Sequence, residues 1–249
     1  MTIAGIFRQS LTLYRENVLK LIGIVAPSSI AVWAVYLFIF GDQLDLTESS
    51  TDSAAMPGVF LYGAIVVFLS SIATAAGTIA ISERFLGREV SISQAYLRVI
   101  DVLFPLLGSL MLASVAIAAG FILFFIPGVV AYVWFCLTPA VVMIEGEGGV
   151  GALKRSYVVI KGYWNKAFFV VVLLAIIQLI VAMLVFSLPT QLGASVSINV
   201  FFKFLSICLP LLIESFKIAT TTILYYDLRI RKEGYTLQIM ADEIASSPQ

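Results

Sequence analysis

Two charged residues in the last hydrophobic segment are the side chains best placed to do chemistry. Glu214 and Lys217 lie three residues apart, so in a helix they share one face. Thr221 and Tyr225 continue that face further along the chain. Charges inside a membrane-spanning segment are costly in lipid and usually serve a substrate contact, an ion contact or a proton relay. The pattern therefore predicts an intramembrane polar site made of these four residues.

The same pair also has a purely structural interpretation. A Glu–Lys pair that neutralises itself and faces other helices fixes their packing without any ligand, and no other apolar segment supplies a charged partner. Transporters draw polar ligands from several interrupted helices. Pro210, one turn before Glu214, could break the helix and free backbone carbonyls, which would favour the functional interpretation. Both interpretations stay open at this stage.

Other chemistries find little support in the sequence. The chain contains no histidine, which removes imidazole acid–base catalysis and histidine metal ligation. Cys136 and Cys208 lie in apolar segments, as small buried residues do. The glycine-rich segment after Glu145 lacks the Gly-Lys-Ser/Thr of a phosphate loop, and we expect its glycines to end a helix. We predict no catalytic, cofactor or metal site, and the sequence favours a non-enzymatic protein over an enzyme.

The composition indicates that these residues lie on membrane-spanning helices. The chain of 249 residues is 61% hydrophobic and 12% charged, with a mean hydropathy of +1.04. A soluble domain carries about 25% charged residues. Six apolar segments are each long enough to cross a hydrocarbon core about 30 Å thick. We therefore predict an all-α membrane protein with six spans, at 21–40, 60–82, 102–123, 125–144, 167–188 and 202–225.

The third and fourth spans form one uncharged stretch, 102–144. A single helix of that length would be about twice as long as the hydrocarbon core is thick. Pro127 and Gly128 lie near its centre, and this pair is typical of a tight turn in which glycine takes a positive φ. We expect a helical hairpin that turns at these two residues.

The basic residues predict the orientation of the chain, because cytoplasmic loops of membrane proteins are rich in Lys and Arg. We predict six spans with both termini in the cytoplasm, where the chain ends in a short tail at 235–249. In this arrangement 13 of the 15 basic residues lie on the cytoplasmic side. The opposite loop, 41–58, is acidic instead. We expect the protein to be located in the cytoplasmic (inner) membrane of a bacterium. The 13 residues are Arg8, Arg15, Lys20, Arg84, Arg88, Arg98, Lys154, Arg155, Lys161, Lys166, Arg229, Arg231 and Lys232.

Short amphipathic stretches precede spans one, three and five. They begin at Gln9, Gln94 and Arg155, and each has a small residue second, an early aromatic residue and mixed charge. We expect three helices that lie at the membrane interface. A threefold duplication with units 1–83, 84–145 and 146–234 would explain them, and so would the common patterning of membrane proteins.

Hydroxyl residues recur every four positions in span two, at Ser70, Thr74, Thr78 and Ser82. Small and hydroxyl side chains let helices approach closely in lipid and form hydrogen bonds across the contact. We interpret the pattern as helix packing, with a polar pathway as the alternative.

Two segments carry a family resemblance: PGVVAYVWFCLTPAVVMIEGEGGVGALKRSY from Pro127, and ILYYDLRIRKEG from Ile223. They resemble bacterial integral membrane proteins related to the glycerophosphoryl diester phosphodiesterase membrane domain, over roughly residues 90–235. The resemblance implies the membrane module alone, since this chain carries no catalytic domain of that kind. Its cytoplasmic signature is either a family feature or a charged cap with internal ion pairs, and consists of Asp227, Arg229, Arg231, Lys232 and Glu233.

Three functions remain open on these observations. The first is a non-enzymatic scaffold or partner-binding module in envelope or lipid handling, with the lipid bilayer, a membrane protein or a second copy as partner and no nucleic acid. The second is a small transporter or channel that uses Glu214 and Lys217. The third and least favoured is an enzyme acting on lipid headgroups. A cavity that reaches the pair would favour transport, a sealed pair would favour the scaffold, and convergence of Glu145 with Asp101 and Asp227 would favour the enzyme.

Overall fold

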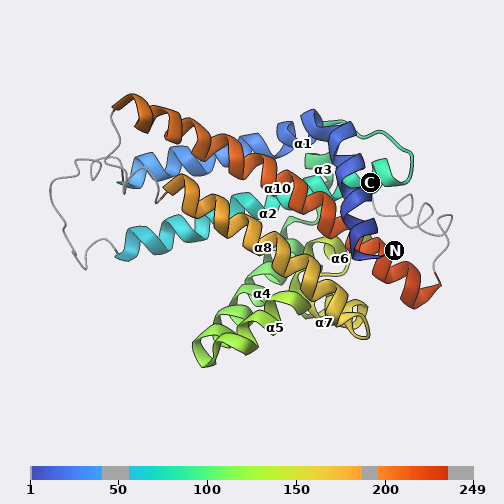
Figure 1. Cartoon of the computed structure of the whole chain (residues 1–249). Coiled ribbons are helices and arrows are strands. Elements are labelled where there is room, and N and C mark those ends of the chain that lie inside the picture. The colour runs from blue at the N-terminus through green and yellow to red at the C-terminus, as the bar shows by residue number, and fades with distance from the viewer. Residues whose placement is uncertain (1, 41–55, 187–195, 235–249) are drawn as a thin grey trace.

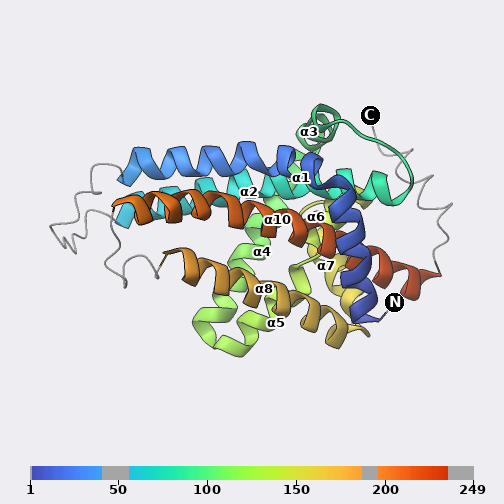
Figure 2. The same ribbon diagram turned by 45° about the horizontal axis from the view of Figure 1, so that its top comes forward.

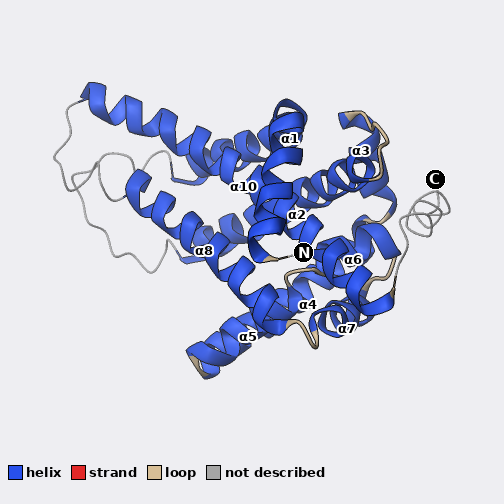
Figure 3. Cartoon of the chain, turned by 45° about the vertical axis from the view of Figure 1, so that its right-hand side comes forward, coloured by secondary structure: helices blue, strands red, loops and turns tan. Residues whose placement is uncertain are grey.

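A computed structural model of the chain describes residues 2–40, 56–186 and 196–234. Every regular element in these three ranges is a helix (Figures 1 and 3). This confirms the predicted all-α class. In chain order the helices are α1 (Ile3–Phe40), α2 (Met56–Phe85), α3 (Ile92–Asp101), α4 (Leu103–Leu123), α5 (Phe125–Phe135), α6 (Thr138–Glu145), α7 (Gly149–Ile160), α8 (Trp164–Phe186) and α10 (Val196–Glu233).

Six helical segments are long and apolar enough to cross a membrane, and each overlaps one of the six predicted spans. The fourth combines α5 and α6, which are separated by a short break before Pro139. The chain is therefore a multi-pass membrane protein. The segments are Ile3–Val35, Leu61–Phe85, Leu103–Leu123, Phe125–Glu145, Trp164–Leu184 and Cys208–Glu233.

The long helices form two groups. In both views α1, α2, α8 and α10 run side by side, while the α4–α5 hairpin points away from them (Figures 1 and 2). α6 and α7 pack where the two groups meet, and the main apolar core lies there. The first turns of α1 and the last turns of α10 lie at the same end of the molecule. We call this end the basic end, because Arg155, Lys166 and Arg229 gather there.

Each predicted amphipathic stretch forms a helix followed by a break before the long helix. Asn17 bends α1 with φ −122° and ψ 16°, and Val102 separates α3 from α4 with φ −112° and ψ 17°. Both residues are ninth in their stretches, counted from Gln9 and Gln94. The third break, before α8, ends at Tyr163, which is ninth from Arg155. The three breaks therefore fall at the same position of their stretches, although the threefold duplication itself stays a prediction.

The hairpin between spans three and four is tight, but the predicted turn is wrong. The chain reverses at Phe124, which is extended with φ −161° and ψ 154°, while Pro127 and Gly128 lie in the first turns of α5. Gly128 has no positive φ. Its role is close packing, because a Cβ atom on Gly120 would lie 2.9 Å from the Gly128 backbone. Proline suits the first turn of a helix, where the N–H it lacks would have no partner.

The glycine-rich segment ends span four as expected. Gly146 follows α6 with φ 72°, the left-handed conformation that glycine adopts without a Cβ penalty, and its N–H donates to the Val142 carbonyl. The chain can then turn into α7. This turn brings Glu145 and Arg155 together, with 2.5 Å between Oε2 and Nε.

Candidate membrane-embedded binding site

Glu214 and Lys217 form an ion pair on α10. The Lys217 ammonium lies 2.6 Å from Glu214 Oε2, and the two side chains are 26% and 21% exposed. The helical spacing placed them on one face, and the structure brings them into direct contact. Neither side chain is sealed by its neighbours.

Pro210 does not break the helix, so that expectation is wrong. α10 runs without interruption from Val196 to Glu233 with Pro210 inside it. In lipid, a backbone group released from a helix has no water to bind, so keeping the remaining helical hydrogen bonds is favoured over unwinding. On α10 the site is therefore built from side chains of a continuous helix rather than from the ends of an interrupted helix.

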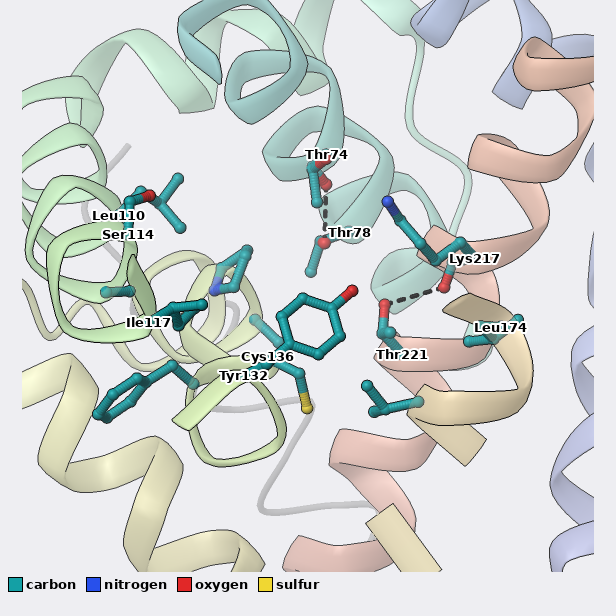
Figure 4. A pocket seen from close by; sticks show the side chains of 15 residues that line it. Thr74, Thr78, Leu110, Ser114, Ile117, Tyr132, Cys136, Leu174, Lys217 and Thr221 are labelled. Atoms are coloured by element: carbon teal, nitrogen blue, oxygen red, sulfur yellow. Dashed lines mark hydrogen bonds between the residues drawn. The ribbon is translucent and has the colours of Figure 1, made fainter. Parts of the chain in front are cut away.

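A cavity of about 220 Å³ reaches this face of α10. Lys217 and Thr221 line it from α10, Thr74 and Thr78 from α2, and Tyr132 from α5 (Figure 4). The rest of the wall comes mostly from apolar side chains of α4, α5, α6 and α8. The cavity thus lies where the α4–α5 hairpin meets the other long helices.

The threonine hydroxyl groups that line the cavity can accept hydrogen bonds from a solute. Thr74 Oγ1 donates to the Ser70 carbonyl, Thr78 Oγ1 to the Thr74 carbonyl and Thr221 Oγ1 to the Lys217 carbonyl, over 2.8 to 2.9 Å. A threonine hydroxyl has one hydrogen, so each oxygen keeps its lone pairs for another partner. Figure 4 shows the Tyr132 hydroxyl pointing between Thr78 and Thr221. Together with the Lys217 ammonium, it adds donors to this acceptor set.

Tyr225 belongs to a different cluster from the other predicted site residues. Its side chain is fully buried, and its hydroxyl donates to Glu145 Oε1 over 2.5 Å at the basic end. The hydroxyl also accepts a hydrogen bond from Arg229 Nη1, at 3.0 Å. The structure therefore brings together Glu214, Lys217 and Thr221 but not Tyr225.

Glu145 is the centre of a charged network at the basic end. Arg155 Nη2 lies 2.5 Å from Glu233 Oε1 as well as contacting Glu145, and Arg229 Nε lies 3.1 Å from Glu233 Oε2. Partial burial lowers the pKa of Arg155, but the hydrogen bonds that Arg155 donates to Glu145 and Glu233, together with the negative charges of these carboxylates, outweigh it, so the pKa is raised. The network joins α6, α7 and α10 through paired charges.

The remaining signature residues are engaged in the same region. The Asp227 carboxylate is buried, pairs with Lys166 of α8 and contacts Arg231 Nε at 3.2 Å. The Lys232 ammonium donates to the Lys161 carbonyl at 2.9 Å and also to the Val158 carbonyl. The signature thus consists of side chains bound within the molecule. Asp227 is directed to Lys166, whereas Glu145 and Asp101 line a second cleft that Asp227 does not line.

Sequence reasoning missed part of the cavity. Tyr132 was not predicted, because one tyrosine in an apolar span carries no periodic signal. Thr74 and Thr78 were assigned mainly to packing, and their four-residue spacing was the signal for the polar alternative. Cys136, expected to be a small buried residue, also lines the cavity.

Comparison of the chain with protein-family models, with curated proteins and with solved structures finds no match.

Proposed function

We propose that the protein is a small membrane transporter or channel whose solute passes or binds at the Lys217 cavity. The observation that carries this proposal is a cavity of about 220 Å³ lined by Lys217, which forms an ion pair with Glu214 inside a membrane-spanning helix. Polar and charged groups in a span are expensive, and they commonly mark a substrate or ion pathway. The mixture of an ammonium, a phenol and three threonine oxygens suits a small polar solute or ion.

The scaffold alternative predicts a pair sealed by neighbouring helices, and the partly exposed Glu214–Lys217 pair favours transport instead. One observation supports the scaffold: Asp227, Arg229 and Glu233 all pair within the molecule, as structural residues do. A partner protein or a second copy of the chain would then dock elsewhere. An enzyme is least supported, because Arg155 and Tyr225 already engage the Glu145 carboxylate.

We also propose that the protein lies in a bacterial cytoplasmic membrane with both of its termini in the cytoplasm. It rests on the 13 basic residues that six spans place on one side. The first part of α1, α3 and α7 would lie at the cytoplasmic interface. α3 supports this role with its Ser91 capping box and its exposed apolar side chains, Leu97 and Ile100.

We further propose membership of the family related to the glycerophosphoryl diester phosphodiesterase membrane domain, as its membrane module alone. The residues that carry the resemblance include Glu145, Ser156 and Tyr225. Two of them are in direct contact, since Glu145 accepts a hydrogen bond from the Tyr225 hydroxyl. The third, Ser156, binds elsewhere in the resembling segment: its Oγ donates to the Trp134 carbonyl over 2.6 Å. The residues of the family pattern would then be those that hold α5, α6 and α7 against α10.

Permeation through liposomes that contain the purified protein tests the transport proposal. Glycerol, potassium and chloride serve as probes, with empty liposomes as the blank. We expect permeation of at least one probe that depends on the protein. Ala113→Phe should abolish it, because Ala113 lines the cavity and a phenyl ring would fill the space.

Ala118→Phe is the matched control, since Ala118 lies on the same helix but is exposed and outside the cavity lining. Its permeation should equal that of the wild type. Permeation indistinguishable from empty liposomes for all three probes, or equal loss in both variants, would contradict the proposal.

A further inference from the structure

A second and larger cleft, of about 890 Å³, opens at the basic end. It lies between the end of α2, the loop that follows it, α3 and the end of α6. Its polar wall includes Ser82, Glu83, Arg88, Gln94, Arg98 and Asp101. These residues do not line the Lys217 cavity, so the cleft is a separate site.

Glu83 and Arg98 anchor one side of the cleft. Glu83 is 2% exposed and pairs with the Arg98 guanidinium, whose side chain is 44% exposed. A guanidinium has five N–H donors in a fixed plane, so pairing with one carboxylate holds it in place and leaves other donors directed outward. Arg88, in the loop after α2, adds a second guanidinium to the same wall. This side is suited to a phosphate group.

Asp101 supplies the opposite charge. It is exposed at the end of α3, and its carboxylate forms no ion pair or hydrogen bond with the part of the chain that the structure describes. The other two carboxylates at the rim have partners: Glu89 contacts Arg84 at 3.3 Å, and Glu145 belongs to the network described above. Asp101 is thus the carboxylate available to a cationic group in the cleft.

Ser82 adds a buried group whose hydrogen-bonding capacity is unused. The residue is 2% exposed and lines the cleft, and its Oγ has no hydrogen-bond partner among the described residues. A buried hydroxyl without a partner is destabilising, so such groups are normally satisfied. A polar ligand in the cleft would remove this cost.

Exposed apolar side chains lie beside the cleft on α3 and at the start of α4. Leu97 lines the cleft and is exposed, and Ile100 is exposed three residues further along α3. Phe104 is exposed in the first turn of α4, just after the break at Val102. A ligand that carries acyl chains could therefore keep its polar part among the charged residues and lay its chains over these three side chains.

We propose that this cleft binds a phosphoethanolamine group, supplied by the headgroup of a phospholipid. The phosphate lies against Arg88 and Arg98, the primary ammonium against Asp101, and the acyl chains leave over Leu97 and Phe104. The inference does not depend on transport at the Lys217 cavity, because the two sites share no lining residue.

Native mass spectrometry of the full chain in detergent tests the proposal by counting bound lipids. The probes are phosphatidylethanolamine, phosphatidylcholine, phosphatidylglycerol and free O-phosphoethanolamine. Phosphatidylcholine keeps the phosphate but its trimethylammonium cannot donate hydrogen bonds, and phosphatidylglycerol lacks the cation. We expect phosphatidylethanolamine to bind about ten-fold more tightly than either, as the loss of one charged hydrogen bond implies. Free O-phosphoethanolamine should bind far more weakly.

Variants separate the two halves of the site. Arg88→Gln and Asp101→Asn should each weaken phosphatidylethanolamine binding by about five- to ten-fold. Arg15→Gln and Glu147→Gln, exposed and outside the cleft lining, should leave it unchanged. Equal binding of the three lipids, or equal effects of cleft and control variants, would overturn the proposal. Equal affinity for free O-phosphoethanolamine would overturn the assignment to a lipid.

Discussion

Single charged side chains at the basic end remain buried because each has a partner. Arg229 is buried in the last turns of α10, where an isolated charge would be strongly disfavoured. The Glu233 carboxylate at 3.1 Å and the Tyr225 hydroxyl at 3.0 Å satisfy its guanidinium, and Glu145 lies 3.7 Å away. The stability of this end should therefore depend on the partners rather than on any one residue.

Glu145→Gln tests this dependence. The substitution keeps the size of the side chain but removes the charge that faces Arg155 and Arg229. Breaking a buried ion pair costs about 3 kcal/mol, so the unfolding midpoint in detergent should fall clearly. Glu147→Gln, two residues further on and exposed, should unfold like the wild type. Equal midpoints for both variants would show that the network contributes nothing to stability.

At the scale of elements, the α4–α5 hairpin depends on two glycines that let the helices touch. A Cβ atom at Gly120 would meet the Gly128 backbone at 2.9 Å, and backbone atoms cannot move aside as a flexible side chain can. At Gly108, earlier on the same helix, a Cβ atom would meet nothing within 4 Å. These two positions differ in packing but not in residue type.

We predict opposite effects of alanine at these positions. Gly120→Ala should lower the free energy of unfolding by about 1–3 kcal/mol, because it forces the two helices apart. Gly108→Ala should raise it by about 0.5–1 kcal/mol, because alanine favours the helix. Unfolding in mixed micelles, followed by circular dichroism, measures both changes. A loss of the same size at Gly108 would show that the close contact is not the cause.

For the whole molecule, the proposed orientation requires both termini on the cytoplasmic side. Green fluorescent protein fused after Gln249 should be fluorescent, and alkaline phosphatase at the same point should be inactive. Alkaline phosphatase inserted within residues 41–55, which the charge pattern places on the opposite side, should be active. The reverse pattern of activities would contradict the orientation and the cytoplasmic position of the basic end.

The fold could be predicted further than the site could. Hydropathy located all six spans, because the need to hide backbone groups from lipid is a local property of each segment. Gly146 was also predictable as a helix stop. The turn at Phe124 was not, since Pro127 and Gly128 have another use in the close contact between α4 and α5.

The Lys217 cavity could not be predicted from spacing alone. The Glu214–Lys217 contact lies within one helix and follows from the helical repeat. The approach of Tyr132 depends on how α4 and α5 tilt against α2, α8 and α10, and this tilt comes from long-range packing. The acidic loop within 41–55 and the tail at 235–249 lie outside the described residues.

The most direct test of the transport account is the reactivity of a cysteine at position 217 toward a small water-soluble thiol reagent. Lys217→Cys is introduced with Cys136→Ala and Cys208→Ala, and the protein is labelled in lipid nanodiscs. Ser93→Cys, exposed on α3, is the reactive control, and Ile218→Cys, fully buried beside the site, is the unreactive one. We predict that Lys217→Cys reacts at a rate close to the Ser93 control. Protection equal to that of Ile218→Cys would mean a dry cavity and contradict transport through it.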